Sequence, residues 1–213
     1  MDIRHHAPDA LLMGYAAGSL PEAFNLVIAT HVSLSDDSRA RLGAMEAVGG
    51  VVLGGCDAEM AAGSLERALE RVGVTPQANG RVPLVADGIF PAPLADFVGH
   101  GLDGVKWTSV GMGVKQAILR NEGGATVRLL RIPAGRAMPD HGHGGMELTL
   151  VLQGAFVDGN NRYGRGDLEV ADQDMDHTPV AAAGEDCICL AATDAPLRFR
   201  GWLPRLVQPF FRI

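Results

Sequence analysis

Apolar residues in the first third of the chain recur at the three- and four-residue spacing of amphipathic helices. The clearest stripe follows Pro21, a residue suited to the first helical turn. It consists of Phe24, Val27, Ile28, His31 and Leu34. Similar stripes predict helices near residues 10–20, 40–48 and 65–72. Helices of about three turns are not stable alone in water. We therefore predict a small helical bundle over residues 1–75 that packs on itself or on a partner.

The hydrophobic pattern changes near residue 94 to an alternation of period two. Residues 76–93, just before the change, combine proline and glycine without a sustained period, which predicts a linker. Beyond it, segments rich in Val, Ile, Leu and Thr cover residues 105–114, 126–132, 148–152 and 188–192. Many short strands without helices predict an antiparallel sandwich or barrel over residues 94–213. The expected fold class is multi-domain, with an α part followed by an all-β part.

The composition supports a folded protein and narrows its partners. Hydrophobic residues make up 47% of the 213 residues, which excludes a globally disordered chain. The formal net charge is −7, and residues 1–80 carry five Arg against ten Asp and Glu. The chain has only two lysines, Lys106 and Lys115, so clustered contacts to phosphate groups, and with them direct nucleic-acid binding, are not expected.

The sequence has no feature of export or of membrane insertion. Its N-terminal segment is polar and lacks the apolar core of a signal peptide. The best apolar run, residues 47–56, is rich in glycine and shorter than the ~20 residues of a membrane span. Three cysteines in such a chain favour a reducing compartment. We expect a cytoplasmic protein without a membrane partner.

Four side chains in the second half have the spacing of metal ligands. His141 and His143 are two residues apart, so on a strand they share one face. Glu147 lies where the next strand can return its carboxylate to the same centre, and His177 is a fourth candidate beyond a predicted hairpin at residues 159–160. Three imidazoles and a carboxylate suit Zn²⁺, Fe²⁺ or Mn²⁺.

The same residues resemble the motifs of the cupin family. The first motif, G-x5-H-x-H-x3-E-x6-G, is matched by Gly135, His141, His143, Glu147 and Gly154. The second, G-x5-P-x-G-x2-H-x3-N, is matched by Gly166 and His177, whereas Asp172, Asp174 and Ala181 replace its Pro, Gly and Asn. The resemblance implies a small β-barrel in which the four predicted ligands converge on a metal. The alternative is a barrel that keeps these side chains for packing and binds no metal.

Cys187 and Cys189 alternate along a predicted strand, so their side chains share one face. Their Cα atoms would lie about 7 Å apart, at or beyond the limit for a disulfide. One interpretation is a pair of small apolar side chains that face the barrel interior. The other is a redox-active thiol pair that is oxidised or joins the metal in a changed state.

A second constellation lies in the N-terminal third, where His6, His31, Ser35 and Ser38 form the spacing H-x24-H-x3-S-x2-S. With cysteine at both serine positions, this spacing would be a structural zinc site. It resembles the zinc-binding anti-sigma domain over roughly residues 1–75. A small acidic helical domain ahead of a cupin is the architecture of the ChrR-type anti-sigma factors, and the chain resembles that family as a whole.

The two serines depart from the family pattern. A serine hydroxyl is not deprotonated near neutral pH and is a far weaker zinc ligand than a thiolate. We therefore expect the N-terminal zinc site at His6 and His31 to be weak or empty. Engineered replacement of both cysteines and natural loss of the metal both explain the serines, and an unrelated bundle with polar helix residues is a third explanation. His5 adjoins His6, and the choice of His6 rests on the family pattern.

The family resemblance implies a regulatory function rather than catalysis. The helical domain would sequester an extracytoplasmic-function sigma factor in a 1:1 complex. The predicted contact residues are Phe24, Val27, Ile28, Leu42 and Met45. The acidic balance of residues 1–80 would complement the basic faces of a DNA-binding partner. The cupin, with Zn²⁺ bound, would sense singlet oxygen and release the sigma factor. The candidate sites of oxidation are His141, His143, Cys187 and Cys189.

Two other functions are compatible with the residues alone. A cupin with three histidines and a glutamate can be a metal-dependent enzyme, a dioxygenase or an isomerase, when the metal keeps an open coordination position. Tetrahedral Zn²⁺ with four protein ligands would leave no such position and would favour a structural or sensing role. A third possibility is a cupin-fold binding protein whose N-terminal helices only oligomerise it.

Overall fold

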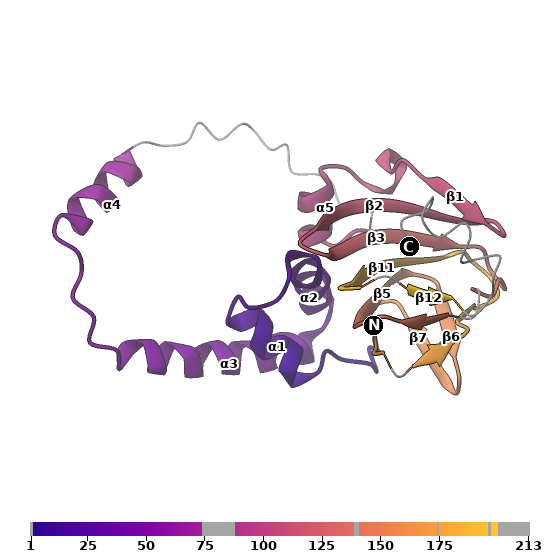
Figure 1. Ribbon diagram of the computed structural model, residues 1–213, viewed down its shortest axis with the longest axis horizontal. Coiled ribbons are helices and arrows are strands. Elements are labelled where there is room, and N and C mark those ends of the chain that lie inside the picture. Colours follow the sequence, from indigo (N-terminus) through magenta and orange to yellow (C-terminus); the bar gives the residue numbers. More distant parts are fainter. Residues whose placement is uncertain (1, 74–87, 139–140, 174, 196, 200–213) are drawn as a thin grey trace.

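Helices form the N-terminal part of the molecule and strands most of the remainder (Figure 1). The computed structural model describes residues 2–73, 88–138, 141–173, 175–195 and 197–199. Most of the predicted linker and the C-terminal end of the predicted β part, residues 200–213, lie outside the described residues. The predicted succession of a helical part and a β part is confirmed.

The N-terminal helices are α1 (Asp9–Ala16), α2 (Glu22–Leu34), α3 (Asp36–Gly54) and α4 (Ser64–Gly73). All four were predicted. Ser35 separates α2 from α3, and its side chain accepts a hydrogen bond of 3.2 Å from the backbone N–H of Ser38, as serine does at many helix starts. α3 continues past Gly49 and Gly50, where the sequence predicted its end, because glycine lowers helix propensity without stopping a helix.

A fifth helix, α5 (Ala92–Val98), was not predicted. It begins after Pro91 and ends at Gly99, whose φ of 80° is the left-handed conformation common at helix ends. A 3-10 turn (Leu102–Gly104) follows it. A helix of seven residues is too short to show a clear hydrophobic period, so the region after residue 94 was predicted to be free of helices.

The strands are β1 (Thr108–Gly111), β2 (Val114–Glu122), β3 (Ala125–Ile132), β4 (His141–His143), β5 (Glu147–Gln153), β6 (Ala155–Asp158), β7 (Asn161–Gly164), β8 (Leu168–Ala171), β9 (Asp176–His177), β10 (Val180–Ala181), β11 (Cys187–Thr193) and β12 (Leu197–Phe199). They form a six-stranded antiparallel sheet in the order β1-β2-β3-β11-β5-β8 and two smaller sheets, β10-β6-β7 and β12-β4-β9. Three predicted strands and the predicted hairpin are confirmed as β3, β5, β11 and the β6–β7 pair. The predicted strand at 105–114 instead holds β1 and the tight turn into β2, where Met112 and both flanking glycines have positive φ.

Both faces of the large sheet are covered. One face packs against the helices, in a core that includes Phe24, Ile28, Leu148, Leu150 and Leu190. The other face packs against the small sheet of β6 and β7, in a core that includes Val151, Phe156, Tyr163, Cys187 and Cys189. Alternate residues of β5 and β11 therefore point to different cores. α2 contacts α5 and strands β3, β5 and β11, so the helical part is packed directly on the β part.

Candidate metal centre and N-terminal polar cluster

The predicted metal motif begins in the small sheet β12-β4-β9. His141 on β4 is the register partner of His177 on β9, and His143 is the partner of Leu197 on β12. The side chains of His141 and His143 lie outside the described part of the structure. Directly opposed residues of an antiparallel pair have Cα atoms about 4.5–5.5 Å apart. The fold therefore brings the two cupin motifs together at the level of the backbone.

Glu147 is the first residue of β5 and is buried. Its Oε1 accepts a hydrogen bond of 3.0 Å from the hydroxyl of Thr149. Burial lowers the pKa of Arg128, and the charge of Glu147 acts against that shift. Thr149 is also the register partner of Glu169 on β8, so the interior of the β part contains a second buried acid near Glu147.

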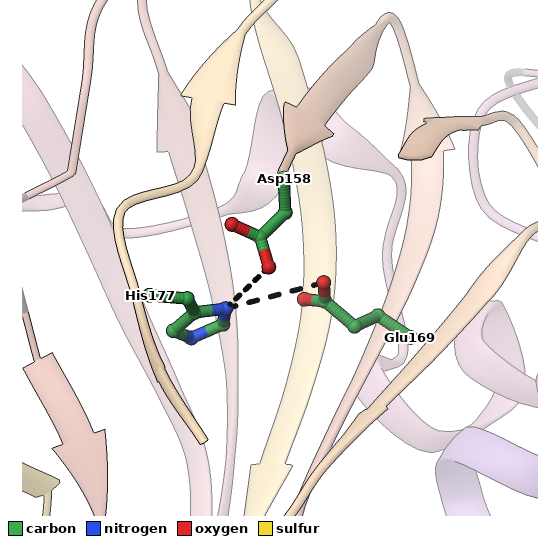
Figure 2. A group of neighbouring side chains, drawn as sticks. All are labelled: Asp158, Glu169 and His177. Atoms are coloured by element: carbon green, nitrogen blue, oxygen red, sulfur yellow. Dashed lines mark hydrogen bonds and ion pairs between the residues drawn. The ribbon is translucent and has the colours of Figure 1, made fainter. Parts of the chain in front are cut away.

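Glu169 belongs to a group of three buried or half-buried side chains that could hold a metal ion (Figure 2). His177 Nδ1 lies 2.9 Å from Asp158 Oδ2 and 4.0 Å from Glu169 Oε1. One ligand atom from each residue lies within 4.8 Å of the other two. The three residues come from β6, β8 and β9, at distant places in the sequence. His177 was predicted as a ligand, whereas Asp158 and Glu169 were not, because neither occupies a motif position.

The pKa of Glu169 is raised to about 8. The main cause is burial, followed by the charges of Asp158 and Glu147 and a hydrogen bond with Asp158. A carboxyl group with this pKa is protonated at neutral pH unless a cation stabilises its charge. The group is therefore an environment in which a positive charge is strongly favoured.

Cys187 and Cys189 are both buried, and their Sγ atoms are 3.5 Å apart. Both are free thiols rather than a disulfide. The hydrogen bond from one thiol to the other, together with burial, raises the pKa of Cys189 well above its usual value. A thiol with a raised pKa is a weak nucleophile and a weak metal ligand. In this state both thiols pack in the inner core beside Val151 and Phe156.

The N-terminal residues that were predicted together do lie together. His6 Nδ1 is 3.0 Å from Ser35 Oγ, and His31 Nε2 is 2.9 Å from Ser38 Oγ. The centroids of the two imidazole rings are 6.3 Å apart. His5 points elsewhere and lies 4.3 Å from the ring of Tyr163. It is thus His6, and not its neighbour, that lies in the cluster.

The hydrogen bonds of this N-terminal cluster do not fit a zinc ion. His31 Nδ1 is 3.0 Å from the carbonyl of Gly166, which can only accept, so Nδ1 carries the proton. Nε2 then accepts from the backbone N–H of Ala7 at 3.1 Å, and it also faces the Ser38 hydroxyl. Burial lowers the pKa of His31 to about 4, so the ring is neutral. Both ring nitrogens already have partners, and the cluster contains no thiolate.

Further hydrogen bonds join the N-terminal segment to the turn between β7 and β8. Asp167 Oδ1 accepts from the backbone N–H groups of Arg4, at 2.7 Å, and His5, at 2.9 Å. The carbonyl of His5 accepts from the N–H of Leu168 at 3.0 Å. Together with the bond from His31 to Gly166, these contacts tie the helical part to the β part.

The predicted sigma-contact residues pack inside this chain. Phe24, Val27, Ile28 and Leu42 are buried, and Met45 is partly buried against the same core. In this structure they are core residues rather than surface contacts. An amphipathic stripe indicates that a helix face is covered, but it does not tell which surface covers it.

Exposed apolar side chains occur instead farther along the helices. They are Val48, Val51, Val52, Leu53, Met60, Leu65, Leu69 and Val72, each more than 60% exposed. They belong to the second half of α3, to α4 and to the segment between, which extend away from the strands in Figure 1. Large exposed apolar side chains gathered in one region of a protein are typical of interaction sites. We call this the α3–α4 apolar surface.

In the part of the chain that is described, no helix has the length and apolar character to cross a membrane.

Comparison with known proteins identifies the architecture. Residues 98–196 match the family described as the ChrR cupin-like domain. The chain is 56% identical to the anti-sigma-E factor ChrR of Cereibacter sphaeroides, over the full length of both proteins. It also superposes on the crystal structure of Rhodobacter sphaeroides SigE in complex with the anti-sigma ChrR, with a TM-score of 0.80 and 54% identity. That match covers 90% of this chain and all of the other.

These matches confirm the helical part followed by a cupin and the regulatory, non-enzymatic class that the sequence predicted. They also separate the chain from both alternatives, a metal-dependent cupin enzyme and a cupin-fold binding protein whose N-terminal helices only oligomerise it, because the identity extends through the N-terminal helices as well as the cupin. The chain belongs to the ChrR family of anti-sigma factors.

Proposed function

We propose that this chain is an anti-sigma factor that binds and sequesters an extracytoplasmic-function sigma factor in a 1:1 complex. The observation that carries the proposal is the 56% identity over the full length of both chains to anti-sigma-E factor ChrR. The related ChrR has been crystallised in complex with SigE. A sigma factor works on RNA polymerase, so the site of action is the cytoplasm.

The α3–α4 apolar surface is our candidate for the sigma-binding surface. Its side chains are exposed, whereas the apolar residues of α2 are already used in the core. Residues 1–80 carry an excess of acidic side chains, which complements the basic faces of a DNA-binding protein and speeds encounter with it. Apolar contact would supply the affinity, and charge would guide the partner.

The helical unit, proposed to span residues 1–75, would hold its shape without zinc. The hydrogen bonds among His6, His31, Ser35 and Ser38 link the N-terminal segment to α2 and to the start of α3. A structural zinc ion would connect the same elements in a family member with two cysteines. Sigma binding by this chain is therefore expected to survive a strong chelator.

The cupin, proposed to span residues 94–213 after a linker at 76–93, would be the sensor. We assign His141, His143, Glu147 and His177 to a divalent metal, with Zn²⁺ as the first candidate. When bound, such an ion supplies a rigid cross-link between strands. Singlet oxygen is the proposed signal, and Cys187 and Cys189 are the proposed thiols at which oxidation would disturb the inner core.

The test is co-purification of this chain with an extracytoplasmic-function sigma factor from the same genome, followed by size exclusion and elemental analysis. The expected result is a 1:1 complex that persists in chelator, with metal only in the cupin. The absence of a complex with every such sigma factor of that genome would contradict the proposal. Size exclusion tests complex formation and elemental analysis tests metal binding by the cupin, so a negative result in one leaves the other proposal standing.

A further inference from the structure

Two acidic side chains of the cupin, Asp158 and Glu169, are buried beside His177 and belong to neither cupin motif. The side chains of Glu169 and His177 are each 4% exposed, and that of Asp158 is 14% exposed. Burying a carboxylate is costly unless hydrogen bonds or a counter-charge compensate for the lost water. A pair of acids in the interior of a small barrel therefore needs an explanation.

The hydrogen bonds account for only part of the group. Asp158 Oδ2 lies 2.9 Å from His177 Nδ1. Glu169 Oε1, by contrast, is a buried oxygen that has no hydrogen-bond partner among the described residues. It lies 4.0 Å from His177 Nδ1. Figure 2 shows the carboxylates of Asp158 and Glu169 pointing toward the same edge of the imidazole.

We propose that Asp158 and Glu169 are ligands of the cupin metal together with His177, so that the centre of this chain contains more carboxylate than the cupin motif predicts. The inference rests on the proposal that the cupin holds a metal. It departs from the motif in two residues, because Asp158 and Glu169 occupy no motif position.

The spacing of the donor atoms fits an ion placed among them. In octahedral coordination, bonds of about 2.0–2.2 Å to oxygen and nitrogen put adjacent donors about 3 Å apart and opposed donors about 4.2 Å apart. The observed separations from His177 Nδ1 are 2.9 Å to Asp158 and 4.0 Å to Glu169. Both separations from His177 Nδ1 match a coordination sphere, and the ligand atoms of Asp158 and Glu169 lie within 4.8 Å of each other.

The donor set also limits the class of ion. Two carboxylates and an imidazole favour first-row divalent cations such as Zn²⁺, Fe²⁺ and Mn²⁺. Calcium is disfavoured because it takes six to eight oxygen ligands. The register of His141 opposite His177 places the first cupin motif beside the same group, so further ligands can come from β4.

The test uses the full chain and Co²⁺, whose visible spectrum reports its coordination. Asp158→Asn and Glu169→Gln keep the size of each side chain and remove its charge. We expect each variant to bind Co²⁺ at least 10-fold more weakly and to change the Co²⁺ spectrum, since a ligand is lost. Glu169→Asp keeps a carboxylate and should bind more tightly than Glu169→Gln. Glu122→Gln, an exposed acid next to the β2–β3 turn, is the matched control.

Metal-free stability distinguishes ligands from packing residues. Replacement of a buried carboxyl group by an amide of the same size should leave the thermal midpoint of the metal-free protein unchanged or raise it, while Co²⁺ affinity falls. The proposal is overturned if Co²⁺ affinity stays within twofold of wild type, or if affinity falls with an unchanged spectrum. It is also overturned if the wild-type chain takes up no Co²⁺. Sigma binding is measured apart from these readouts, so the proposed function can stand or fall independently.

Discussion

His31 connects the helical part to the cupin through both of its ring nitrogens. Its Nδ1 donates to Gly166 in the cupin, and its Nε2 accepts from Ala7 and faces Ser38 in the helical part. Each such hydrogen bond contributes about 1 kcal/mol to the net free energy of folding. A buried donor or acceptor that loses its partner destabilises the fold by more than this amount. A neutral histidine with both nitrogens engaged is therefore a stable connector, although a weaker one than zinc.

The pH dependence of stability should report this neutral state of His31. Its pKa in the folded chain is about 4, below the usual 6.5, because burial penalises the charged ring. Between these values the unfolded chain binds a proton that the folded chain does not. Stability present at pH 7 is therefore lost as the pH falls, by about 2 kcal/mol between pH 7 and pH 5.

Denaturant unfolding at pH 7 and pH 5 measures that loss. His31→Gln should remove most of the pH-dependent part, whereas His100→Gln, at a half-buried histidine in the turn after α5, should keep it. An equal loss in wild type and His31→Gln would show that His31 is not the responsible group.

Cysteine at positions 35 and 38 should create a zinc site. The hydroxyl oxygens of Ser35 and Ser38 already lie 3.0 and 2.9 Å from ring nitrogens of His6 and His31. In Ser35→Cys/Ser38→Cys, two thiolates would therefore lie beside these histidines, as in a structural zinc site. We expect one additional zinc ion per chain by elemental analysis. Ser19→Cys/Ser33→Cys adds two thiols on exposed residues and should bind no additional zinc. Equal zinc content in both variants would contradict the assignment of the site.

At the scale of elements, local sequence predicted most of what was local. The stripe from Phe24 to Leu34 identifies α2, and the glycine-containing turns separate β3, β5 and β11. What covers α2 could not be predicted, because the strands that pack on it are far away in sequence. The same limit hides Asp158 and Glu169: each lies on its own strand, and only the fold brings both to His177.

The exposed half of α3 offers the sharpest test of sigma binding. Val51→Ser/Leu53→Ser changes two side chains that are 78% and 75% exposed, so the free energy of unfolding should change by less than about 0.5 kcal/mol. Loss of apolar contact should weaken sigma binding at least 10-fold in a titration.

Two further variants provide contrast. Met112→Ser, at an exposed apolar residue of the β1–β2 turn, should leave sigma affinity unchanged. Phe24→Ala should instead destabilise the fold by about 3–5 kcal/mol, since Phe24 is buried in the shared core. Wild-type affinity in the double α3 variant would exclude this surface as the binding site.

At the scale of the whole molecule, the turn before β8 connects two regions of proposed function. Gly166 and Asp167 accept three hydrogen bonds, from Arg4, His5 and His31. The N–H of Leu168 donates a fourth, to the carbonyl of His5. Glu169 lies on β8, two residues beyond Asp167, and belongs to the group around His177. A shift of β8 would therefore change both the contacts with the N-terminal segment and the group around His177.

Asp167→Ala should release the N-terminal segment from the cupin. The substitution removes the acceptor for the N–H groups of Arg4 and His5, and also the acceptor for Gly164. We expect amide exchange at residues 4 and 5 to speed up by at least 10-fold, and stability to fall by about 1–3 kcal/mol. Asp103→Ala, in the exposed 3-10 turn, should change neither. If exchange at residues 4 and 5 stays slow in Asp167→Ala, other contacts hold the helical part, and the turn before β8 is not the element through which the cupin and the helices are joined.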